Sequence, residues 1–337
     1  MKNKKILYIG NNLTKKTKYN STMTALSSLL KIEGYGVILS SDKINKISRL
    51  LDMLFTTIKY RNKTDYLLID TYSTINFYYA FLISQLARIL HIKYIPILHG
   101  GNLPERISQS SILSNLIFNN SYKNIVPSQY LKHEFEKKGY KTTFIPNILE
   151  INNYVFKERK KITPKLFWVR AFKEIYNPTL AINVLKLIKK QYPNAILCMV
   201  GPFVDNSHRK TLALLKEYKL EDSVEFTDVL LKEDWHKKSI NYDIFINTTN
   251  FDNTPVSVME AMALGLPVVS TNVGGIPYLI ENKKDGLLVN KENSKEMAAA
   301  IIEVLQGKYP NLAIEARKKV EGFSWVANKD KWLKILT

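Results

Sequence analysis

The sequence predicts an α/β protein made of two parallel-sheet units, and three observations lead to this prediction. The chain has 337 residues, more than a single compact core of ordinary size uses, which indicates two domains. Short apolar runs alternate with amphipathic stretches, as they do where helices connect parallel strands. This alternation stops at a polar, highly charged segment, residues 152–164, and then starts again. We therefore expect two similar units that are joined once.

The first unit is expected to contain five strands connected by helices. The strands are short, mostly apolar runs at residues 5–9, 37–40, 66–70, 94–98 and 124–126. Residues 21–33 and 44–60 have helical spacing, and the second of these helices carries an apolar stripe. The stripe consists of Ile44, Ile47, Leu50, Leu51, Leu54, Phe55 and Ile58. The basic residues off the stripe are Lys43, Lys46, Arg49, Lys59 and Arg61.

The second unit repeats the alternation. Its expected strands are residues 166–169, 195–200, 224–227, 244–247 and 267–270. A helix is predicted over residues 178–191, where Asn177 provides the N-cap and Pro178 occupies the first turn. Proline is favoured in that turn because its missing N–H would have no partner there in any case.

Composition excludes several classes of protein. A chain that is 45% hydrophobic and 23% charged is ordinary for a globular protein, so a disordered or fibrous chain is excluded. The single cysteine, Cys198, allows no internal disulfide and no cysteine-rich metal site, which favours a reducing compartment. The apolar run at the N-terminus is too short for a signal peptide, and no run is long enough to span a membrane. A cytoplasmic protein is therefore expected.

The positive charge is concentrated in the first half of the chain. Residues 1–150 hold 21 basic and 9 acidic side chains, a balance of +12, whereas the remaining residues hold 28 and 21, a balance of +7. Anionic surfaces should therefore attract the first half more strongly. A lysine-rich composition without functional consequence is the alternative. No zinc-finger spacing and no RNA-binding aromatic motif occurs, so no nucleic-acid partner is expected. A phosphate-loop kinase is not expected, because the Gly-x-x-x-x-Gly-Lys-Ser/Thr motif is missing.

The amphipathic segment 43–63 has two interpretations. A basic and apolar helix suits a lipid-linked or polysaccharide acceptor at the inner membrane surface, with which the protein would associate peripherally. Alternatively, the apolar stripe packs into the core and the basic face is solvated. We favour the second interpretation.

Loops that follow the strands are expected to carry the functional residues, because ligands of open parallel sheets bind beyond the carboxyl ends of the strands. Five such loops contain unusual residues. They are residues 10–12, 99–102, 170–177, 201–202 and 248–255.

The most informative loop leads into residues 252–270. A strand ends near Asn247 and a helix begins near Val256, so the first amide groups of that helix lack a partner within it and favour an anion such as phosphate. Glu260 lies about one turn inside the helix, where its carboxylate suits the two hydroxyls of a ribose. A simple helix start with a solvated Glu260 is the alternative.

This segment resembles the signature of family-four retaining glycosyltransferases of the GT-B fold, known as glycosyl transferases group 1. In that signature two acidic residues lie eight positions apart, before a Gly-x-Pro-Val-Val run. The resemblance implies that Glu260 binds the ribose of the sugar donor and that Asp252 contacts the transferred sugar. It also implies that backbone amides around Thr254 and Val256 meet the diphosphate, to which Pro255 offers none. The family usually has Glu and Gly where this chain has Asp252 and Asn253.

A second match follows the first strand of the second unit. Many family members have an Arg there and a Lys-Gly pair before the next helix, and the Arg and Lys clamp the diphosphate. Arg170 keeps the first place, and Lys173 is the candidate for the second because Ile175 and Tyr176 replace the usual pair. A guanidinium binds phosphate through forked, charge-assisted hydrogen bonds, whereas a surface ion pair is the alternative for Arg170. Gly201, in a further matching segment, is expected on the donor side.

In the first unit, the resemblance implies residues on the acceptor side. His99 ends a strand and occupies the place of a histidine that lies near the reacting sugar in several relatives, and a structural histidine is the alternative. Arg106 contacts acceptor or phosphate, or forms a solvated ion pair. The expected acceptor-side residues are Gly10, Asn11, Asn12, Gly100, Gly101, Asn102 and Arg106.

The resemblance covers nearly the whole chain and implies its domain plan. The GT-B fold has two Rossmann-like parallel-sheet domains that face each other across a cleft. Residues 1–152 would form the acceptor-side domain and residues 153–322 the nucleotide-sugar-binding domain. Residues 323–337 look like the helix that crosses back to the N-terminal domain in such folds.

The resemblance also implies a hexosyltransferase. Such an enzyme moves a sugar from a UDP-, GDP- or ADP-sugar to a saccharide or lipid-linked acceptor, in surface polysaccharide or glycan biosynthesis. His99, Asp252 and Arg170 are the expected catalytic residues, and retention by same-face attack is implied. No cofactor is expected, and the lack of an Asp-x-Asp motif predicts no metal site. A nucleotide-sugar epimerase and a non-catalytic nucleotide-sugar-binding protein remain alternatives.

Overall fold

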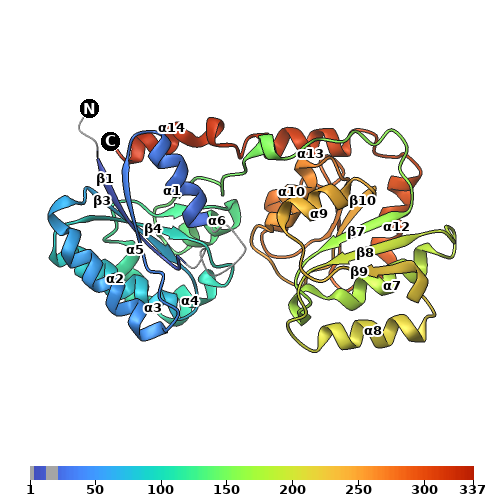
Figure 1. Ribbon diagram of the computed structural model, residues 1–337, viewed down its shortest axis with the longest axis horizontal. Helices are drawn as coiled ribbons and strands as arrows, with labels where there is room; N and C mark the ends of the chain where they lie inside the picture. The colour runs from blue at the N-terminus through green and yellow to red at the C-terminus, as the bar shows by residue number, and fades with distance from the viewer. Residues whose placement is uncertain (1–3, 13–21) are drawn as a thin grey trace. The chain divides into compact units, whose positions relative to one another are not determined.

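The chain divides into two compact units, each built around its own sheet. The computed structural model describes residues 4–12 and 22–337 (Figure 1). Unit 1 comprises the described residues up to Ile148 together with Trp325–Thr337, and unit 2 comprises Leu149–Ser324. Each unit contains a six-stranded sheet in which all paired strands run parallel. The predicted α/β class with two Rossmann-like parallel sheets is therefore confirmed.

The sheet of unit 1 has the strand order β2-β1-β3-β4-β5-β6. All five strands expected from the sequence are present, and β6 is an addition that has only two residues, too few to give a periodic signal. The strands are β1 (Lys5–Ile9), β2 (Gly36–Ser40), β3 (Tyr66–Thr71), β4 (Lys93–Leu98), β5 (Ile125–Val126) and β6 (Thr143–Phe144).

Helices cover both faces of this sheet because successive strand residues point to opposite sides. Ile6 and Tyr8 pack on one side with residues of α1 and α14, whereas Leu7 and Ile9 pack on the other side with residues of α2 and α3. The short helices α4 to α6 pack around the ends of β4 and β5. The helices are α1 (Thr22–Ile32), α2 (Lys46–Tyr60), α3 (Asn76–Ile89), α4 (Leu103–Gln109), α5 (Ser111–Phe118), α6 (Gln129–Lys137) and α14 (Trp325–Ile335).

The sheet of unit 2 has the strand order β12-β11-β10-β7-β8-β9. The five expected strands are present, and β12, which has three residues, was not expected. The strands are β7 (Lys165–Val169), β8 (Ile196–Val200), β9 (Val224–Phe226), β10 (Ile244–Asn247), β11 (Val268–Thr271) and β12 (Leu287–Val289).

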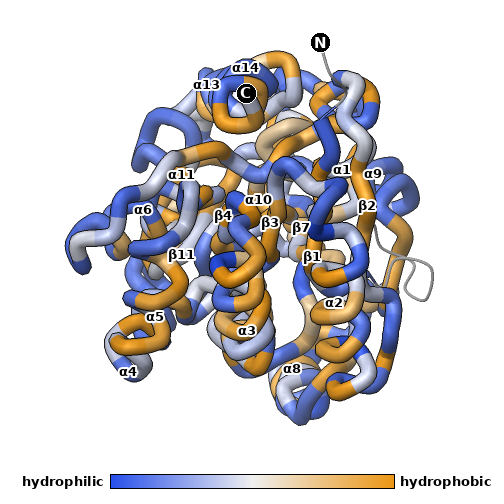
Figure 2. The backbone as a smooth tube through the Cα atoms, turned by 90° about the vertical axis from the view of Figure 1, so that its left-hand side faces the viewer, coloured by the Kyte–Doolittle hydropathy of each residue, from blue (hydrophilic) through white to orange (hydrophobic). Residues whose placement is uncertain are grey.

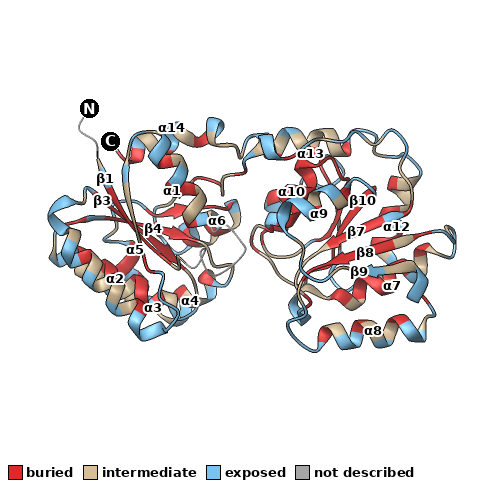
Figure 3. Cartoon of the chain, in the orientation of Figure 1, coloured by how far each residue is buried: buried red, intermediate tan, exposed pale blue. Residues whose placement is uncertain are grey.

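The core of unit 2 also has two layers, one on each face of the sheet (Figure 3). Leu166 and Trp168 of β7 pack with α7, α8 and α12, whereas Phe167 packs with α9, α10, α11 and α13. The helices are α7 (Pro178–Ile188), α8 (Ser207–Glu217), α9 (Lys232–Ser239), α10 (Val256–Ala263), α11 (Ile276–Leu279), α12 (Ser294–Leu305) and α13 (Leu312–Glu321). As predicted, Asn177 caps α7, and its side chain accepts a hydrogen bond from the N–H of Leu180.

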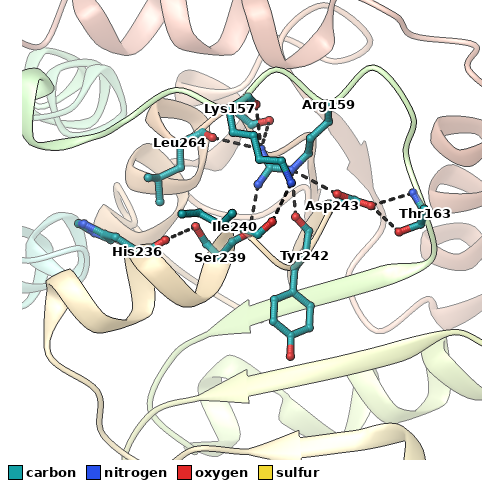
Figure 4. Close-up of polar contacts among 10 residues, drawn as sticks. Lys157, Arg159, Thr163, His236, Ser239, Ile240, Tyr242, Asp243 and Leu264 are labelled. Atoms are coloured by element: carbon teal, nitrogen blue, oxygen red, sulfur yellow. Dashed lines mark hydrogen bonds and ion pairs between the residues drawn. The ribbon is translucent and has the colours of Figure 1, made fainter.

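The polar segment 152–164 belongs to unit 2, where one buried arginine ties it down (Figure 4). Arg159 donates to five backbone carbonyl groups and lies 3.6 Å from the Asp243 carboxylate. Asp243 in turn accepts hydrogen bonds from the backbone and the hydroxyl of Thr163. A charged sequence therefore does not make this segment a loose linker.

Within residues 4–12 and 22–337, no helix is both long enough and apolar enough to cross a bilayer.

Candidate nucleotide-sugar site

In unit 2, an ion pair joins the loops that follow β7 and β10. Arg170 comes directly after β7, and its Nη2 donates to Oδ2 of Asp252, which lies in the loop between β10 and α10. The two side chains are only 15% and 16% exposed. Burial raises the pKa of Asp252, while the nearby Arg170 opposes that shift. The structure thus brings together two of the three side chains that were expected to be catalytic.

Hydrogen bonds fix these two loops to each other. The indole N–H of Trp168 donates to Thr248 Oγ1, which itself donates to the carbonyl of Tyr176, at 2.9 and 2.8 Å. The Asn250 N–H donates to the Ile175 carbonyl at 2.7 Å. The Arg170 guanidinium lies 4.8 Å from the centre of the Tyr176 ring, a cation–π distance. Tyr176, which replaces the glycine of the family pattern, therefore supports Arg170.

Two glycines allow the backbone to close tightly around this pair. Gly201 has φ of +147°, and a Cβ there would lie 1.8 Å from the Arg170 carbonyl oxygen. The N–H of Gly275 donates to the Asp252 carbonyl, and a Cβ on Gly275 would lie 1.8 Å from the Asn253 carbonyl oxygen. Only glycine fits at either position, because any other residue would collide with the backbone.

Helix α10 starts beside Asp252 without a side-chain cap. Pro255 is its N-cap residue and forms no capping hydrogen bond. The first N–H groups of a helix, here those of Val256 and Ser257, have no intrahelical partner. Thr254 is half-buried in the loop just before. The start of α7, by contrast, is capped by the side chain of Asn177.

Glu260 of α10 is buried and paired, so the alternative of a solvated carboxylate is wrong. It is 3% exposed. Its Oε1 accepts a hydrogen bond from the Tyr154 hydroxyl at 3.0 Å and lies 2.6 Å from Lys232 Nζ. A buried carboxylate needs such partners, because an isolated charge is costly to bury. Lys232 itself is half-exposed, so it can exchange with a ligand.

Sequence reasoning missed three residues around Glu260. Tyr154 precedes it by 106 positions, and Lys232 and His236 lie on α9. The His236 ring is 4.8 Å from the Tyr154 ring. Burial lowers the pKa of His236 to about 4, and the nearby Lys232 ammonium adds to that effect. No sequence signal links these residues, because only the fold brings α9 beside α10.

Lys173 does not join the Arg170 pair. Its side chain is exposed, and it forms no ion pair within the ranges that the structure describes. The candidate second cation of the diphosphate clamp thus has no contact that holds it in place in the ligand-free chain.

Several buried polar atoms in unit 2 lack a partner. Six buried side-chain nitrogen or oxygen atoms have none among the described residues, and five of them lie in unit 2. Three flank the carboxyl ends of β7 and β10, namely Arg170 Nε, Asn247 Oδ1 and Ser257 Oγ, and a fourth is Nε2 of His236. Such atoms are rare in native proteins and indicate a position for water or a ligand.

Unit 1 has a different polar cluster at the carboxyl ends of its strands. His99 follows β4, and its Nε2 lies 2.8 Å from Oδ1 of Asp70 on β3. The Tyr8 hydroxyl of β1 donates to the same oxygen at 2.8 Å, and the Tyr72 ring stacks on the imidazole at 5.2 Å. Sequence reasoning missed Asp70 and Tyr8, although a carboxylate near the end of the otherwise apolar β3 was a usable signal.

The glycines near His99 permit close backbone packing. A Cβ on Gly10 would lie 2.5 Å from Asp70 Oδ2, and one on Gly100 would lie 2.9 Å from the Ser73 amide nitrogen. Gly101 is half-buried, at the turn before α4. Gly10, which was expected on the acceptor side, thus packs closely against Asp70.

The remaining acceptor-side candidates lie around this cluster. Asn11 accepts a hydrogen bond from Arg49, and the N–H of Asn12 donates to the Ser41 carbonyl. Asn102 is exposed at the start of α4. Arg106 donates to the Ser73 carbonyl at 2.8 Å and forms no ion pair with a described residue, so the ion-pair alternative is wrong.

The arrangement in unit 2 suits a nucleotide. An arginine beside an uncapped helix start can hold phosphate groups, and a buried carboxylate can hold a pair of ribose hydroxyls. The fold defines an α/β protein of the Rossmann-like class, and unit 2 gathers these groups at the carboxyl ends of its strands.

Comparison with known proteins identifies the family. The model of the family "Glycosyl transferases group 1" matches residues 150–321, about half of the chain, and the chain belongs to this family. It is 32% identical over 131 residues to the putative colanic acid biosynthesis glycosyltransferase WcaL of Escherichia coli, and this alignment covers 36% of this chain and 31% of WcaL. It is 30% identical over 149 residues to the amylovoran biosynthesis glycosyltransferase AmsK of Erwinia amylovora, 42% of this chain and 36% of AmsK. The alignments thus span about a third of these relatives.

Solved structures share the fold over nearly the full length. Sucrose-phosphate synthase from Thermosynechococcus elongatus superposes with a TM-score of 0.78 at 16% identity, covering 98% of both chains. Anabaena HepE in complex with UDP and glucose superposes with a TM-score of 0.75 at 17% identity, again covering 98% of both chains. The GT-B architecture that the motifs implied is therefore confirmed for this chain.

Proposed function

We propose that this protein is a retaining glycosyltransferase. It moves a sugar from a nucleotide-diphosphate sugar to a saccharide or lipid-linked acceptor, in the synthesis of a surface polysaccharide or glycan. Family membership supports the reaction class, and the names of WcaL and AmsK support the polysaccharide context. The observation that carries the proposal is Arg170, which lies beside Asp252 and has a buried Nε without a partner.

Unit 2 binds the donor in this proposal. The bond between the anomeric carbon and a diphosphate oxygen breaks, and negative charge grows on the departing nucleoside diphosphate. Arg170 and the amides around Thr254 and Val256 stabilise that charge, and Lys173 approaches it from the exposed side. Asp252, with Asn253 beside it, contacts the transferred sugar. Gly201 acts through the close backbone approach that positions Arg170.

Glu260 binds the ribose. Its burial and its hydrogen bond from Tyr154 hold the carboxylate in one place before the donor arrives. Lys232 neutralises that carboxylate in the ligand-free chain and, being half-exposed, moves aside for the ribose hydroxyls. Two ribose hydroxyls then donate to the Glu260 carboxylate in place of the Lys232 ammonium group.

Unit 1 serves the acceptor side, and His99 lies near the reacting sugar. Asp70 accepts a hydrogen bond from Nε2 of His99, which leaves Nδ1 as the other ring nitrogen for chemistry. Gly10, Gly100 and their neighbours lie on this acceptor side, where the two glycines let the backbone pack against Asp70 and Ser73. Retention follows if the acceptor attacks from the face that the diphosphate leaves, with a phosphate oxygen taking the acceptor proton.

The donor can be identified by thermal unfolding of the full chain with UDP, GDP, ADP and their sugars. A ligand that binds only the folded state raises the melting temperature, and the rise is larger the more the ligand concentration exceeds its dissociation constant. HepE was solved with UDP and with UDP-glucose, so UDP is the first base to test. No effect from any of the three would overturn the proposal.

Turnover separates the enzyme from its alternatives. Transfer to an added acceptor, with an α-linked product from an α-linked donor by proton NMR, supports retention. Conversion of the donor to a free epimerised sugar would indicate an epimerase, and binding without any turnover would indicate a sensor. Since Arg170 supplies positive charge at the diphosphate, we propose a metal-independent reaction, and a large loss of activity in EDTA would contradict this. We also propose a cytoplasmic enzyme that can associate with the inner membrane face.

A further inference from the structure

The apolar stripe of α2 is largely exposed, contrary to the interpretation we favoured from the sequence. Five members of the stripe are between 43% and 72% exposed, and they are Ile44, Ile47, Leu51, Phe55 and Ile58. Leu50 and Leu54 are half-buried and pack at the edge of the core with Met53, which is fully buried. The helix thus packs on the sheet through a narrow strip and leaves most of its apolar surface uncovered.

Four of these side chains lie on one side of the helix, and Ile44 comes just before its N-cap residue, Asn45. They are three or four positions apart along the chain, the spacing that places residues one above another on an α-helix. The stripe begins just before α2 and continues to its last turn, a length of about 20 Å at 1.5 Å per residue. Apolar residues recur along the whole of α2 in Figure 2. In Figure 3 the same helix is largely pale blue and tan, which marks exposed and half-buried residues.

Exposed cations lie at both ends of this stripe. Lys43 and Lys46 are at its beginning, and Lys59, Arg61 and Lys63 follow its end. The only acidic residues between positions 42 and 63 are Asp42 and Asp52. Asp52 accepts a hydrogen bond from Ser40, so it turns toward β2.

Arg49 does not belong to this surface. It is 8% exposed, and its guanidinium donates to the carbonyls of Lys43 and Ile44 and to Asn11 Oδ1. These bonds hold the chain that enters α2 against the first loop of the sheet. The start of the helix is therefore fixed by buried bonds, and the exposed stripe does not depend on a partner for its shape.

We propose that the exposed face of α2, meaning the five apolar side chains and the five flanking cations, rests on an anionic phospholipid membrane. The apolar side chains enter the boundary between headgroups and acyl chains, and the cations meet the lipid phosphates. This deepens the proposed function, since a membrane at unit 1 would present a lipid-linked acceptor to that unit. A second copy of this chain is the less suitable occupant, because pairing two such faces would bring like charges together at their ends.

The test is flotation of the full chain with vesicles. Wild-type protein is expected to float with vesicles of phosphatidylcholine and phosphatidylglycerol, and much less with phosphatidylcholine alone or at high salt. Exchange of two exposed apolar residues, L51S with F55S, should lower the bound fraction at least about tenfold. The matched control is I89S with I112S, two residues that are 74% and 75% exposed on α3 and α5, and it should bind as wild type does.

Charge is tested separately. The pair K59Q and K63Q should weaken binding to anionic vesicles, whereas K137Q and K138Q, exposed lysines at the end of α6, should not. If the wild type fails to float, or if L51S with F55S floats as well as the control pair, the proposal is wrong. If light scattering shows a dimer that L51S with F55S dissociates, with no vesicle binding, the face belongs to a second copy instead.

The two proposals fail in different ways. Vesicle binding needs no turnover, and hydrolysis of the sugar donor needs no vesicle. A chain that floats but never turns over a donor contradicts the proposed function alone. A chain that turns over a donor at the same rate in both α2 variants, yet never floats, contradicts the membrane surface and the association with the inner membrane face, but leaves the proposed transfer reaction in place.

Discussion

Unit 1 and unit 2 differ in how completely the buried polar groups at the ends of their strands are paired within the protein. In unit 1, Asp70 accepts from Tyr8 and bonds to His99, and Gly10 packs against its other oxygen. In unit 2, Arg170 has a buried donor without a partner, and Glu260 is matched to a half-exposed lysine. The first cluster is complete without a ligand, whereas the second is not. A complete cluster can orient a side chain, and an incomplete one can bind.

The largest expected effect is on Arg170. Replacing it in R170A removes the guanidinium from the departing diphosphate, and turnover should fall about 100- to 1,000-fold. R170K should recover only part of this, because an ammonium cannot form the forked pair. Steady-state transfer rates measure the effect, with R209A, an exposed arginine of α8, as the control. Equal rates in R170A and R209A would remove Arg170 from the site.

A change in unit 1 should affect turnover without affecting donor binding. D70N keeps the size of Asp70 but removes the charge that orients His99, so turnover should fall by up to about 100-fold through misplacement. The dissociation constant for the nucleoside diphosphate, measured by calorimetry, should stay unchanged. Y8F removes only one of the two bonds to Asp70 and should have a smaller effect. A loss of nucleotide affinity in D70N would contradict this division of roles.

A change at Glu260 should do the opposite. E260Q weakens a charge-assisted pair of bonds to the ribose, and affinity for the nucleoside diphosphate should fall about tenfold. A 2′,3′-dideoxy nucleotide provides the control, since it lacks the hydroxyls and should bind wild type and E260Q equally. Unequal binding of that analogue would mean that Glu260 acts elsewhere.

The smallest effect concerns stability and His236. The pKa of His236 is about 4 in the folded chain against 6.5 for an ordinary histidine, so between these values the unfolded chain binds more protons. The contribution of neutral His236 to the free energy of unfolding should therefore be complete above about pH 6.5. The free energy of unfolding should decrease as the pH falls from there toward 4. Urea unfolding across this range measures it. H236Q should make the free energy of unfolding depend less steeply on pH. H133Q, which replaces an exposed histidine of α6, should leave that dependence unchanged.

The sequence was a good guide to strands and to strand-end loops. Ten strands were predictable because each has an apolar run, whereas β6 and β12 have two and three residues and no period to detect. Asn177 was predictable because capping is a local property. These are features that neighbouring residues decide.

Features that distant residues decide were not predictable. The burial of Glu260 depends on Tyr154 and Lys232, which come from other elements. The stripe of α2 shows the same limit, since periodicity reports that a helix has two faces but not which face finds a partner. The family pattern placed Arg170 correctly after its strand, yet its support by Tyr176 follows from a departure from that pattern.

Helix α14 has a practical consequence for anyone who cuts this protein into parts. Its Trp332 and Ile335, with Leu336 just after it, fill one layer beneath β1 and β3, and Trp325 donates to Glu33 of the turn after α1. A gene fragment that stops at residue 148 would encode a sheet with one apolar face left partly uncovered. Expression of that half on its own calls for splicing the final helix onto it through an artificial tether.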